Sequence, residues 1–285
     1  MTTIYLIRHA EAEGNLYRRA HGWYNSTITD RGYHQIAALA KRFADTKFDA
    51  VYSSDRFRTM ITALAIYKTH GLPLRTVRAL REIDVGYWED TPWAELERTD
   101  PEQLAYFSND SQKWHVDGCE SFAEVRERMR KALTEIAEAH PNETVAVFSH
   151  GMAMRIIVGT LQGMTLHEID RTGHAENTAV AKLEYENGTF NVIFRDDASH
   201  LGDQIALSDA AGREDGAAMR ARVRECLTDE LFAEVALLRV LLEPKFADRA
   251  HAAAAGFDAD RADDIAAVHH VEVSAFARGC GKRHF

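Results

Sequence analysis

The segment Ile4-Tyr5-Leu6-Ile7-Arg8-His9 is the most informative about the fold, because it joins a short apolar run to two polar side chains. Such a run is typical of a strand that is buried on both faces of a parallel sheet. Sheets of this kind bind ligands beyond the carboxyl ends of their strands, which is where Arg8 and His9 follow. A single Arg-His pair is a weak signal, so the prediction of a site there depends on the rest of the chain.

A second apolar run with a histidine after it lies near the middle of the chain. Residues 144–148 read Thr-Val-Ala-Val-Phe and precede Ser149-His150-Gly151, where a helix is expected to begin. If the two strands are neighbours, His9 and His150 meet at one edge of the sheet. Imidazole is a competent nucleophile toward phosphorus, Arg8 can neutralise phosphoryl oxygens, and the backbone N–H groups of a helix start can hold an anion.

Strands and helices alternate along the first two-thirds of the chain. The expected strands span 4–7, 50–53, 144–148, 178–185 and 190–195, and helices are expected to start near residues 30, 55, 121 and 151. Asp30 is predicted as a helix cap, Ser121 to Glu124 has the form of a capping box, and Asn187-Gly188 is a hairpin signal at one sheet margin. The pattern predicts a three-layer α/β/α sandwich on a mostly parallel, doubly wound sheet.

The composition of the chain changes after about residue 200. Residues 201–285 contain 20 alanines, few β-branched residues and no clear strand. We therefore predict one α/β domain over residues 1–200 and an alanine-rich helical C-terminal extension over residues 201–285. The sequence does not indicate the role of that extension.

Charge and composition exclude several classes of protein. The net charge of -10 argues against nucleic acid as a partner, and no apolar run reaches the length of about 18 residues that a membrane-spanning helix needs. The first residues lack the basic start of a signal peptide. Three cysteines without a C-x-x-C pair favour a reducing compartment over disulfides or a zinc site, so we expect a cytoplasmic protein without a metal.

Five short motifs occur in the same order as in a known family. They are Leu6-Ile7-Arg8-His9-Ala10-Glu11, Tyr52-Ser53-Ser54-Asp55 with Arg58, Leu80-Arg81-Glu82-Ile83-Asp84 with Gly86, Gly118 with Glu120-Ser121, and Ser149-His150-Gly151. Over residues 1–197 the chain thereby resembles the histidine phosphatase superfamily, which is also called the phosphoglycerate mutase-like family. It departs from the family pattern at Asp90, where glycine is usual and where the geometry of the turn is left open.

The resemblance implies an enzyme that works through a phosphohistidine. His9 would be the nucleophile, and Arg8, Arg58 and His150 would surround the oxygens of the transferred phosphoryl group. Glu82 would protonate the leaving alkoxide and then deprotonate the attacking water. The predicted catalytic residues are thus His9, Glu82, Arg8, Arg58 and His150, and the predicted substrate-binding residues are Arg8, Asn15, His21, Gly22, Arg58, Glu82, His150 and Gly151. No cofactor and no metal ion are implied.

Three functions remain open at this point. The phosphatase branch is favoured, because Glu82 is not followed by the Arg-His-Tyr-Gly continuation of the mutases and residues 91–117 contain only two cations. A cofactor-dependent phosphoglycerate mutase is the alternative, and a non-catalytic interaction module on the same fold is a third. The expected partner is a small phosphorylated substrate, with neither nucleic acid nor membrane. A homodimer is compatible with the sequence, which determines neither the oligomeric state nor the substrate.

Overall fold

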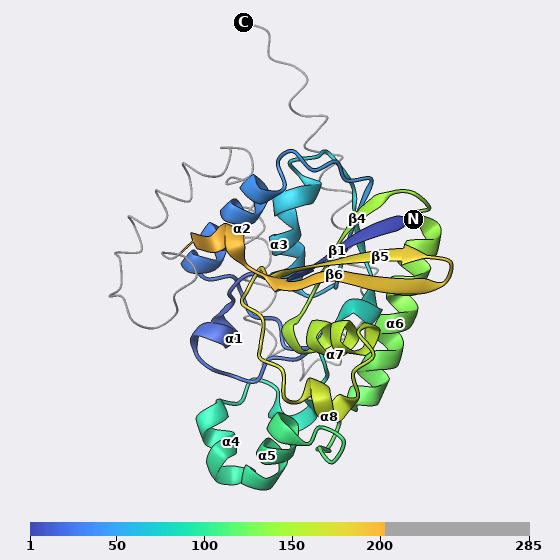
Figure 1. The fold of residues 1–285 in the computed structure, drawn as a ribbon. Helices are drawn as coiled ribbons and strands as arrows, with labels where there is room; N and C mark the ends of the chain where they lie inside the picture. The colour runs from blue at the N-terminus through green and yellow to red at the C-terminus, as the bar shows by residue number, and fades with distance from the viewer. Residues whose placement is uncertain (203–285) are drawn as a thin grey trace, which may run out of the picture. The chain divides into compact units, whose positions relative to one another are not determined.

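The computed structural model describes residues 1–202, and a six-stranded sheet lies at their centre (Figure 1). The strands are β1 (Thr2–Arg8), β2 (Ala50–Ser53), β3 (Leu74–Thr76), β4 (Thr144–Ser149), β5 (Val180–Glu186) and β6 (Thr189–Asp197), in the spatial order β3-β2-β4-β1-β5-β6. The first four are parallel to one another, whereas β5 and β6 are antiparallel to their neighbours. The predicted hairpin therefore forms one margin of a mostly parallel sheet.

The register of the sheet brings the two histidine motifs together. β1 and β4 are paired neighbours, with Arg8 opposite Ser149. His9 and His150, which follow directly, thus leave the sheet at the same level. On the other side of β4, Ser53 in β2 is opposite Phe148, so the segment that starts at Ser54 leaves at this edge as well. The prediction that these strands are neighbours is confirmed.

Helices cover both faces of the sheet, as the predicted three-layer sandwich requires (Figure 1). They are α1 (Glu13–Leu16), α2 (Asp30–Arg42), α3 (Phe57–Tyr67), α4 (Trp93–Thr99), α5 (Pro101–Asn109), α6 (Phe122–Ala139), α7 (Gly151–Leu161) and α8 (Leu166–Ile169). Helices α2 and α3 pack together on one face, and α6 and α7 pack together on the other. Three short 3-10 turns complete the elements, η1 (Arg78–Leu80), η2 (Gly86–Trp88) and η3 (Ser199–Leu201).

Helix starts follow the capping chemistry of the sequence, with one correction. Ser121 and Glu124 form the predicted capping box of α6, each accepting a hydrogen bond from the backbone of the other. The predicted cap of α2 at Asp30 is wrong by one residue. Thr29 is the cap, and its side chain accepts from the amide of Gly32, while Asp30 occupies the first turn, where its charge suits the helix dipole.

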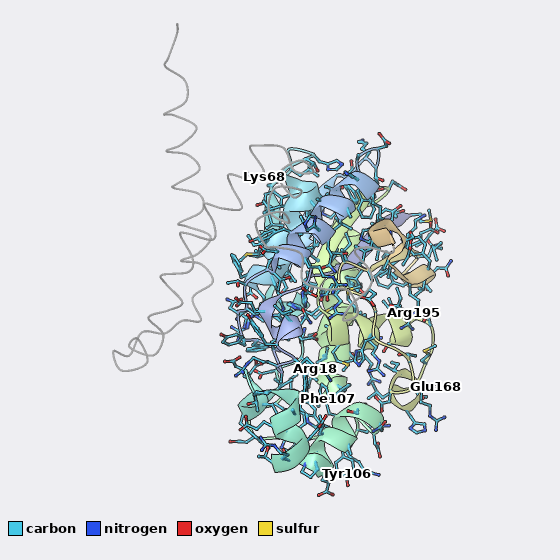
Figure 2. All side chains as sticks on the ribbon, turned by 90° about the vertical axis from the view of Figure 1, so that its left-hand side faces the viewer. Arg18, Lys68, Tyr106, Phe107, Glu168 and Arg195 are labelled. Carbon is cyan, nitrogen blue, oxygen red and sulfur yellow. The ribbon has the colours of Figure 1, made fainter. Side chains whose placement is uncertain are left out.

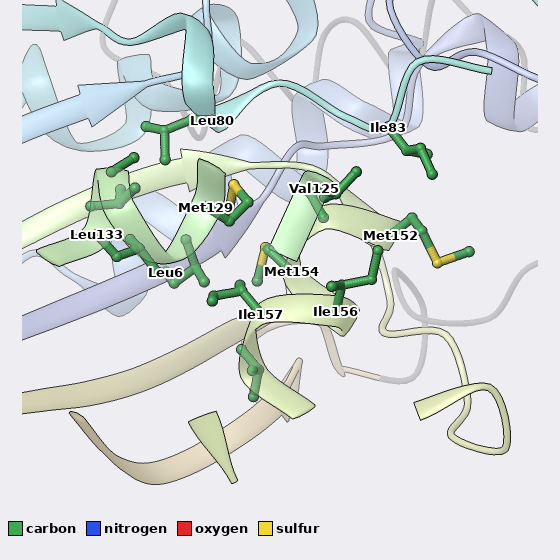
Figure 3. Packing of buried hydrophobic residues seen from close by; sticks show 14 of the residues in the cluster. Leu6, Leu80, Ile83, Val125, Met129, Leu133, Met152, Met154, Ile156 and Ile157 are labelled. Atoms are coloured by element: carbon green, nitrogen blue, oxygen red, sulfur yellow. The ribbon is translucent and has the colours of Figure 1, made fainter. Parts of the chain in front are cut away.

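The core beside α6 and α7 also anchors the third motif. Leu80 and Ile83 are buried among side chains from β1, α6 and α7 (Figure 3). Burial of an aliphatic side chain of this size contributes about 1.5–3 kcal/mol. The two anchors therefore fix the irregular segment that carries Arg81 and Glu82 between them.

The excursion between η2 and α6 contains helices α4 and α5, which the sequence analysis did not predict. Its interior is an aromatic cluster in which Trp88 contacts Trp93, Phe107 and Trp114, with Trp88 fully buried. On α5, Phe107 lies on the side toward the sheet and Tyr106 at the outer tip (Figure 2). Trp88 thus packs in a core. The predicted C-terminal extension lies beyond residue 202, outside the described residues, and stays a prediction.

Candidate active site

The carboxyl ends of β1 and β4 place two imidazole rings side by side. The centroids of the His9 and His150 rings are 5.3 Å apart, and both side chains are buried. The half-buried ring of His21, which comes from the loop after α1, lies 5.8 Å from that of His9. His9, His21 and His150, which were all predicted as site residues, therefore lie close together in one site.

His9 is held in the form that a nucleophile needs. Its Nδ1 lies 2.7 Å from the carbonyl oxygen of Ala10, which can only accept, so Nδ1 carries the proton and Nε2 keeps its lone pair. Burial, together with the positive charges of Arg58 and Arg8, holds the pKa of His9 well below its usual range. The ring is therefore neutral near pH 7 and has an unprotonated Nε2.

His150 is a second buried imidazole that is neutral near pH 7. Its Nε2 lies 2.9 Å from the hydroxyl of Ser54, which accepts a hydrogen bond from the amide of Arg56 and still has its own hydrogen to donate to Nε2. Burial and the charge of Arg58 hold the pKa of His150 well below its usual range. Nδ1 then carries the ring proton, and this buried atom has no hydrogen-bond partner among residues 1–202.

Arg58 supplies a buried positive charge next to the histidines. Its side chain is 0% exposed, and its terminal nitrogens donate to the carbonyl oxygens of Tyr24, His21 and Gly22 at 2.8–3.0 Å. Its Nε has no partner within the described part of the chain. Burial lowers the pKa of Arg58 to about 10, so the guanidinium keeps its charge near neutrality.

Arg8 lies against the first turn of α7. One terminal nitrogen donates to the carbonyl oxygen of Ala175, whereas its buried Nε lacks a partner among the described residues. A Cβ added to Gly151 would lie 3.2 Å from that Nε, so glycine at this position lets the guanidinium approach the helix start. The two arginines and His150 thus each present one unpartnered nitrogen.

Glu82 occupies the start of α7 with its carboxylate. The oxygens accept from the amides of Met152 at 3.0 Å and Ala153 at 2.8 Å, and from the amide of Ile83 at 2.9 Å. The donors that a helix start offers to an anion are therefore directed at Glu82 in this structure. A direct role of Gly151 in binding substrate stays a prediction.

Asn15 belongs to a chain of hydrogen bonds behind the histidines. Its side-chain amide nitrogen lies 3.2 Å from Nε2 of His21, and its carbonyl oxygen accepts from the amide of Ala12. Asn177 donates to the backbone oxygen of His9 at 3.0 Å and to the Asn15 side chain at 3.4 Å. These hydrogen bonds link the backbone of His9 to the His21 loop, and Asn177 had not been predicted.

The two segments at the mouth of the site are tied to each other. Ala20 exchanges backbone hydrogen bonds with Thr91 and Asp90, and the amide of Trp93 donates to Arg18. Asp90 adopts a φ of 59°, a left-handed conformation that favours glycine, and this explains why the family usually has glycine here. The Asp90 side chain pairs with Arg19 at 2.5 Å. Glu89 accepts from the amides of Trp23 and Tyr24, and burial raises the pKa of its carboxyl.

The structure brings the predicted site residues together, and sequence reasoning missed several residues that hold them. Asn177, Glu89 and Arg128 each bind the backbone of a site segment, as hydrogen bonds of 2.6–3.0 Å show. No local pattern distinguishes them, because such roles arise only when distant segments meet. Glu120 was part of a quoted motif, and it is the partner of Arg128.

The described residues contain neither a metal-binding cluster nor a membrane-spanning helix. Within residues 1–202, no group of three or more His, Cys, Asp or Glu side chains gathers so as to hold a metal ion. In the same residues, no helix combines the length and the apolar character needed to cross a membrane. The cytoplasmic location and the homodimer stay predictions.

Comparison with known proteins gives a family match. The sequence model of the "Histidine phosphatase superfamily (branch 1)" matches residues 4–198. Phosphoserine phosphatase 1 of Hydrogenobacter thermophilus is 30% identical over 203 residues, which cover 71% of this chain and 96% of that protein. A probable phosphoglycerate mutase, GpmB of Yersinia pestis, is 30% identical over 186 residues, which cover 65% of this chain and 86% of that protein.

Solved structures agree with the sequence match. Bacillus stearothermophilus YhfR superposes with a TM-score of 0.68 at 30% sequence identity, covering 70% of this chain and 99% of that one. The family resemblance and the fold predicted from the motifs are confirmed.

Proposed function

This chain belongs to the histidine phosphatase superfamily, and we propose that it hydrolyses small phosphomonoesters through a phosphohistidine on His9, without a metal ion. One observation carries the proposal. Arg8 Nε, Arg58 Nε and His150 Nδ1 are buried next to the His9 region and have no partner among the described residues. A buried donor without an acceptor is unfavourable by about 1–3 kcal/mol, and the oxygens of a bound phosphoryl group would satisfy all three.

In the first step, Nε2 of His9 attacks phosphorus in line with the ester oxygen, so that a P–N bond forms as the P–O bond breaks. The guanidinium groups of Arg8 and Arg58 and the Nδ1–H of His150 stabilise the charge on the three remaining oxygens. The leaving alkoxide takes a proton from Glu82. That proton can enter with the substrate, because a phosphomonoester has a second pKa near 6 and binds in part as its protonated monoanion.

In the second step, water attacks the phosphorus of the phosphohistidine. Glu82 takes the proton from this water, the P–N bond breaks, and Nε2 of His9 regains its lone pair as inorganic phosphate leaves. The acceptor role in which the Glu82 carboxylate is found suits this step, since it binds N–H groups through both oxygens. The backbone donors would also keep the carboxylate aimed between the reacting groups.

The proposed substrate class is a small phosphorylated metabolite. A relative that is 30% identical along nearly its whole length is named a phosphoserine phosphatase, which supports a substrate of that size. Tyr17 and Tyr24, in the segment of residues 16–27, and Tyr87, in η2, are exposed. We expect these segments to contact the alcohol part of a substrate rather than the phosphate.

A phosphoglycerate mutase is the second candidate, because another relative of 30% identity is named a probable one. A mutase must hold a second phosphate, and this requires further cations near the site. In residues 91–117 the two cations are exposed, and Lys113 pairs with Asp110 at 2.7 Å, while Arg19 at the mouth pairs with Asp90. These pairings favour the hydrolase.

The test measures hydrolysis of p-nitrophenyl phosphate and of a panel of phosphorylated metabolites, with and without EDTA. We expect turnover that survives EDTA and a phosphorylated protein, trapped after acid-free quenching, whose label is acid-labile and base-stable. A strict requirement for added magnesium or zinc would overturn the proposal. Faster phosphate transfer between phosphoglycerates than hydrolysis would establish the mutase, and no turnover of any substrate would establish a non-catalytic module.

A further inference from the structure

The segment that carries Glu82 lies in neither a helix nor a strand. It connects η1, which ends at Leu80, to η2, which begins at Gly86. The carbonyl groups of such a segment lack the partners that regular structure provides and must find others. Proton transfer needs the carboxyl group placed within hydrogen-bond reach of the reacting oxygen, so whatever fixes this backbone affects catalysis.

Arg128, on α6, is the partner of three of these carbonyl groups, and Trp23 Nε1 also donates to that of Glu82 at 2.9 Å. Its Nη1 donates to the carbonyl oxygens of Ala79 and Arg81 at 2.8 Å each, and its Nη2 donates to the carbonyl oxygen of Glu82 at 2.9 Å. The guanidinium thus binds three carbonyls of four consecutive residues. A guanidinium can do this because its donors are fixed in one plane, whereas the ammonium group of lysine has three donors without that fork.

Glu120 fixes the guanidinium from the other side. Its two carboxylate oxygens accept from Nε and Nη2 of Arg128 at 2.6 and 2.8 Å, so all five N–H groups of the arginine are used. The side chains are 19% and 15% exposed, and the pair is therefore largely withdrawn from water. The amide of Glu120 also donates to the carbonyl oxygen of Asp84, which holds the far end of the same segment.

From this geometry we propose that Arg128, locked by Glu120, is a positioning residue for the proton transfers of Glu82. The proposal rests on the proposed function, in which Glu82 is the general acid and base. It also gives a role to Glu120 of the fourth motif, because its side chain pairs with Arg128. Arg128 contacts backbone only at this segment and does not touch the carboxylate of Glu82.

The experiment compares two substrates with different leaving groups on the same protein preparations. An alkyl phosphate such as glycerol 2-phosphate needs a proton on its leaving oxygen, whereas p-nitrophenolate leaves without one. The variants are Arg128→Lys and Glu120→Gln, with Arg130→Lys as the matched control. Arg130 lies on the same helix, and its side chain is 57% exposed and pairs with Glu127 at the surface.

The readout is the ratio of kcat for the alkyl phosphate to kcat for p-nitrophenyl phosphate. This ratio does not depend on the fraction of folded protein, so a destabilised variant remains informative. We expect Arg128→Lys to lower the ratio about 10- to 100-fold, because misplacement of a catalytic group by about 1 Å costs on the order of 100-fold. Glu120→Gln should lower it less, and Arg130→Lys should leave it unchanged.

Two outcomes separate the inference from the function on which it rests. An unchanged ratio in Arg128→Lys and Glu120→Gln, together with a lowered ratio in Glu82→Gln, would overturn the positioning role while leaving the proposed function intact. An unchanged ratio in Glu82→Gln itself would overturn the acid role of Glu82 and, with it, the inference. Adding Arg128→Lys to Glu82→Gln should produce no further change in the ratio if the arginine acts through Glu82.

Discussion

Arg58 and Arg128 are both largely buried and both bind the carbonyl groups of a loop, yet they differ in what they leave unused. Arg128 directs all five N–H groups at protein acceptors, whereas the fully buried Arg58 keeps Nε unpartnered among the described residues. Arg58 also lies close enough to His9 for its charge to lower the histidine's pKa. Arg128, whose N–H groups all bind protein acceptors, fixes structure. Arg58, with a buried donor left over, can still bind a ligand.

Substitution of His9, the proposed nucleophile, should have the largest effect on activity of the changes considered. His9→Ala should lower kcat by several orders of magnitude, because no other group would form the covalent intermediate, and it should abolish labelling by substrate. The melting temperature should stay within a few degrees of the wild type or rise, since the site serves chemistry rather than stability. A variant that keeps more than about one-hundredth of the wild-type rate would show that His9 is not the nucleophile.

Glu82→Gln tests whether the carboxyl group gives a proton or only orders the site. The amide retains the shape but cannot donate to a leaving oxygen, so hydrolysis of an alkyl phosphate should fall by about 10²–10⁴-fold and that of p-nitrophenyl phosphate much less. Steady-state kinetics on both substrates provide the measurement. Equal losses on the two substrates would show that Glu82 is not the proton donor, and His150 would become the next candidate.

The pH dependence of the free energy of unfolding measures how much the neutral histidines of the site destabilise the folded protein in acid. The pKa values of His9, His21 and His150 are held well below 6.5 by burial and by the nearby arginines. Above pH 6.5 these groups are neutral in both folded and unfolded chains. Below it the unfolded chain alone takes up protons, so the free energy of unfolding falls with pH by up to about 1.4 kcal/mol per pH unit for each histidine.

Urea unfolding at pH 7.5 and pH 5.5 checks this dependence. His9→Asn should make the loss smaller by the share of one histidine, and the control His167→Gln, at an exposed position on α8, should leave it unchanged. A stability that is the same at both pH values would mean that the site histidines are protonated in the folded protein.

The smallest expected effect concerns the hydroxyl that orients His150. Ser54→Ala removes the donor to Nε2, so the ring can place its proton on either nitrogen and no longer reserves Nδ1–H for the phosphoryl group. One neutral hydrogen bond is worth about 0.5–1.5 kcal/mol, which predicts a loss in kcat/KM of about 3- to 10-fold. Ser53→Ala is the control, because that hydroxyl donates to the Ser54 backbone, and a matching loss there would remove the assigned role of Ser54.

The sheet, and the meeting of the predicted site residues at its edge, were predictable because their signals are local. The strand of residues 50–53 and the helix from Gly151 to Leu161 have the predicted bounds, since an apolar run and a glycine start are properties of neighbouring residues. Helices α4 and α5 were missed. Their formation depends on the packing of Trp88, Trp93 and Phe107 with each other and with α6. Contacts between separate segments cannot be predicted from a short stretch of sequence.

Supporting residues were less accessible to sequence reasoning for a related reason. Arg128 follows Arg126 and precedes Arg130 on one helix, and only the fold turns one of the three toward the Glu82 segment. Asn177 lies far along the chain from the His9 carbonyl that it binds. Long-range hydrogen bonds of this kind depend on the order of the strands in the sheet. The sequence pattern limits the possible orders but does not determine which one forms.

The hydrogen bonds between residues 18–20 and residues 90–93 limit how the substrate specificity of this protein can evolve. The two segments share three backbone hydrogen bonds and the Arg19–Asp90 pair, so neither can be reshaped alone without leaving groups of the other unpaired. Evolution of a new specificity should therefore proceed by matched changes in both segments. A chimera that exchanges them together should remain active, and one that exchanges a single segment should lose its fold at the mouth before it gains a new substrate.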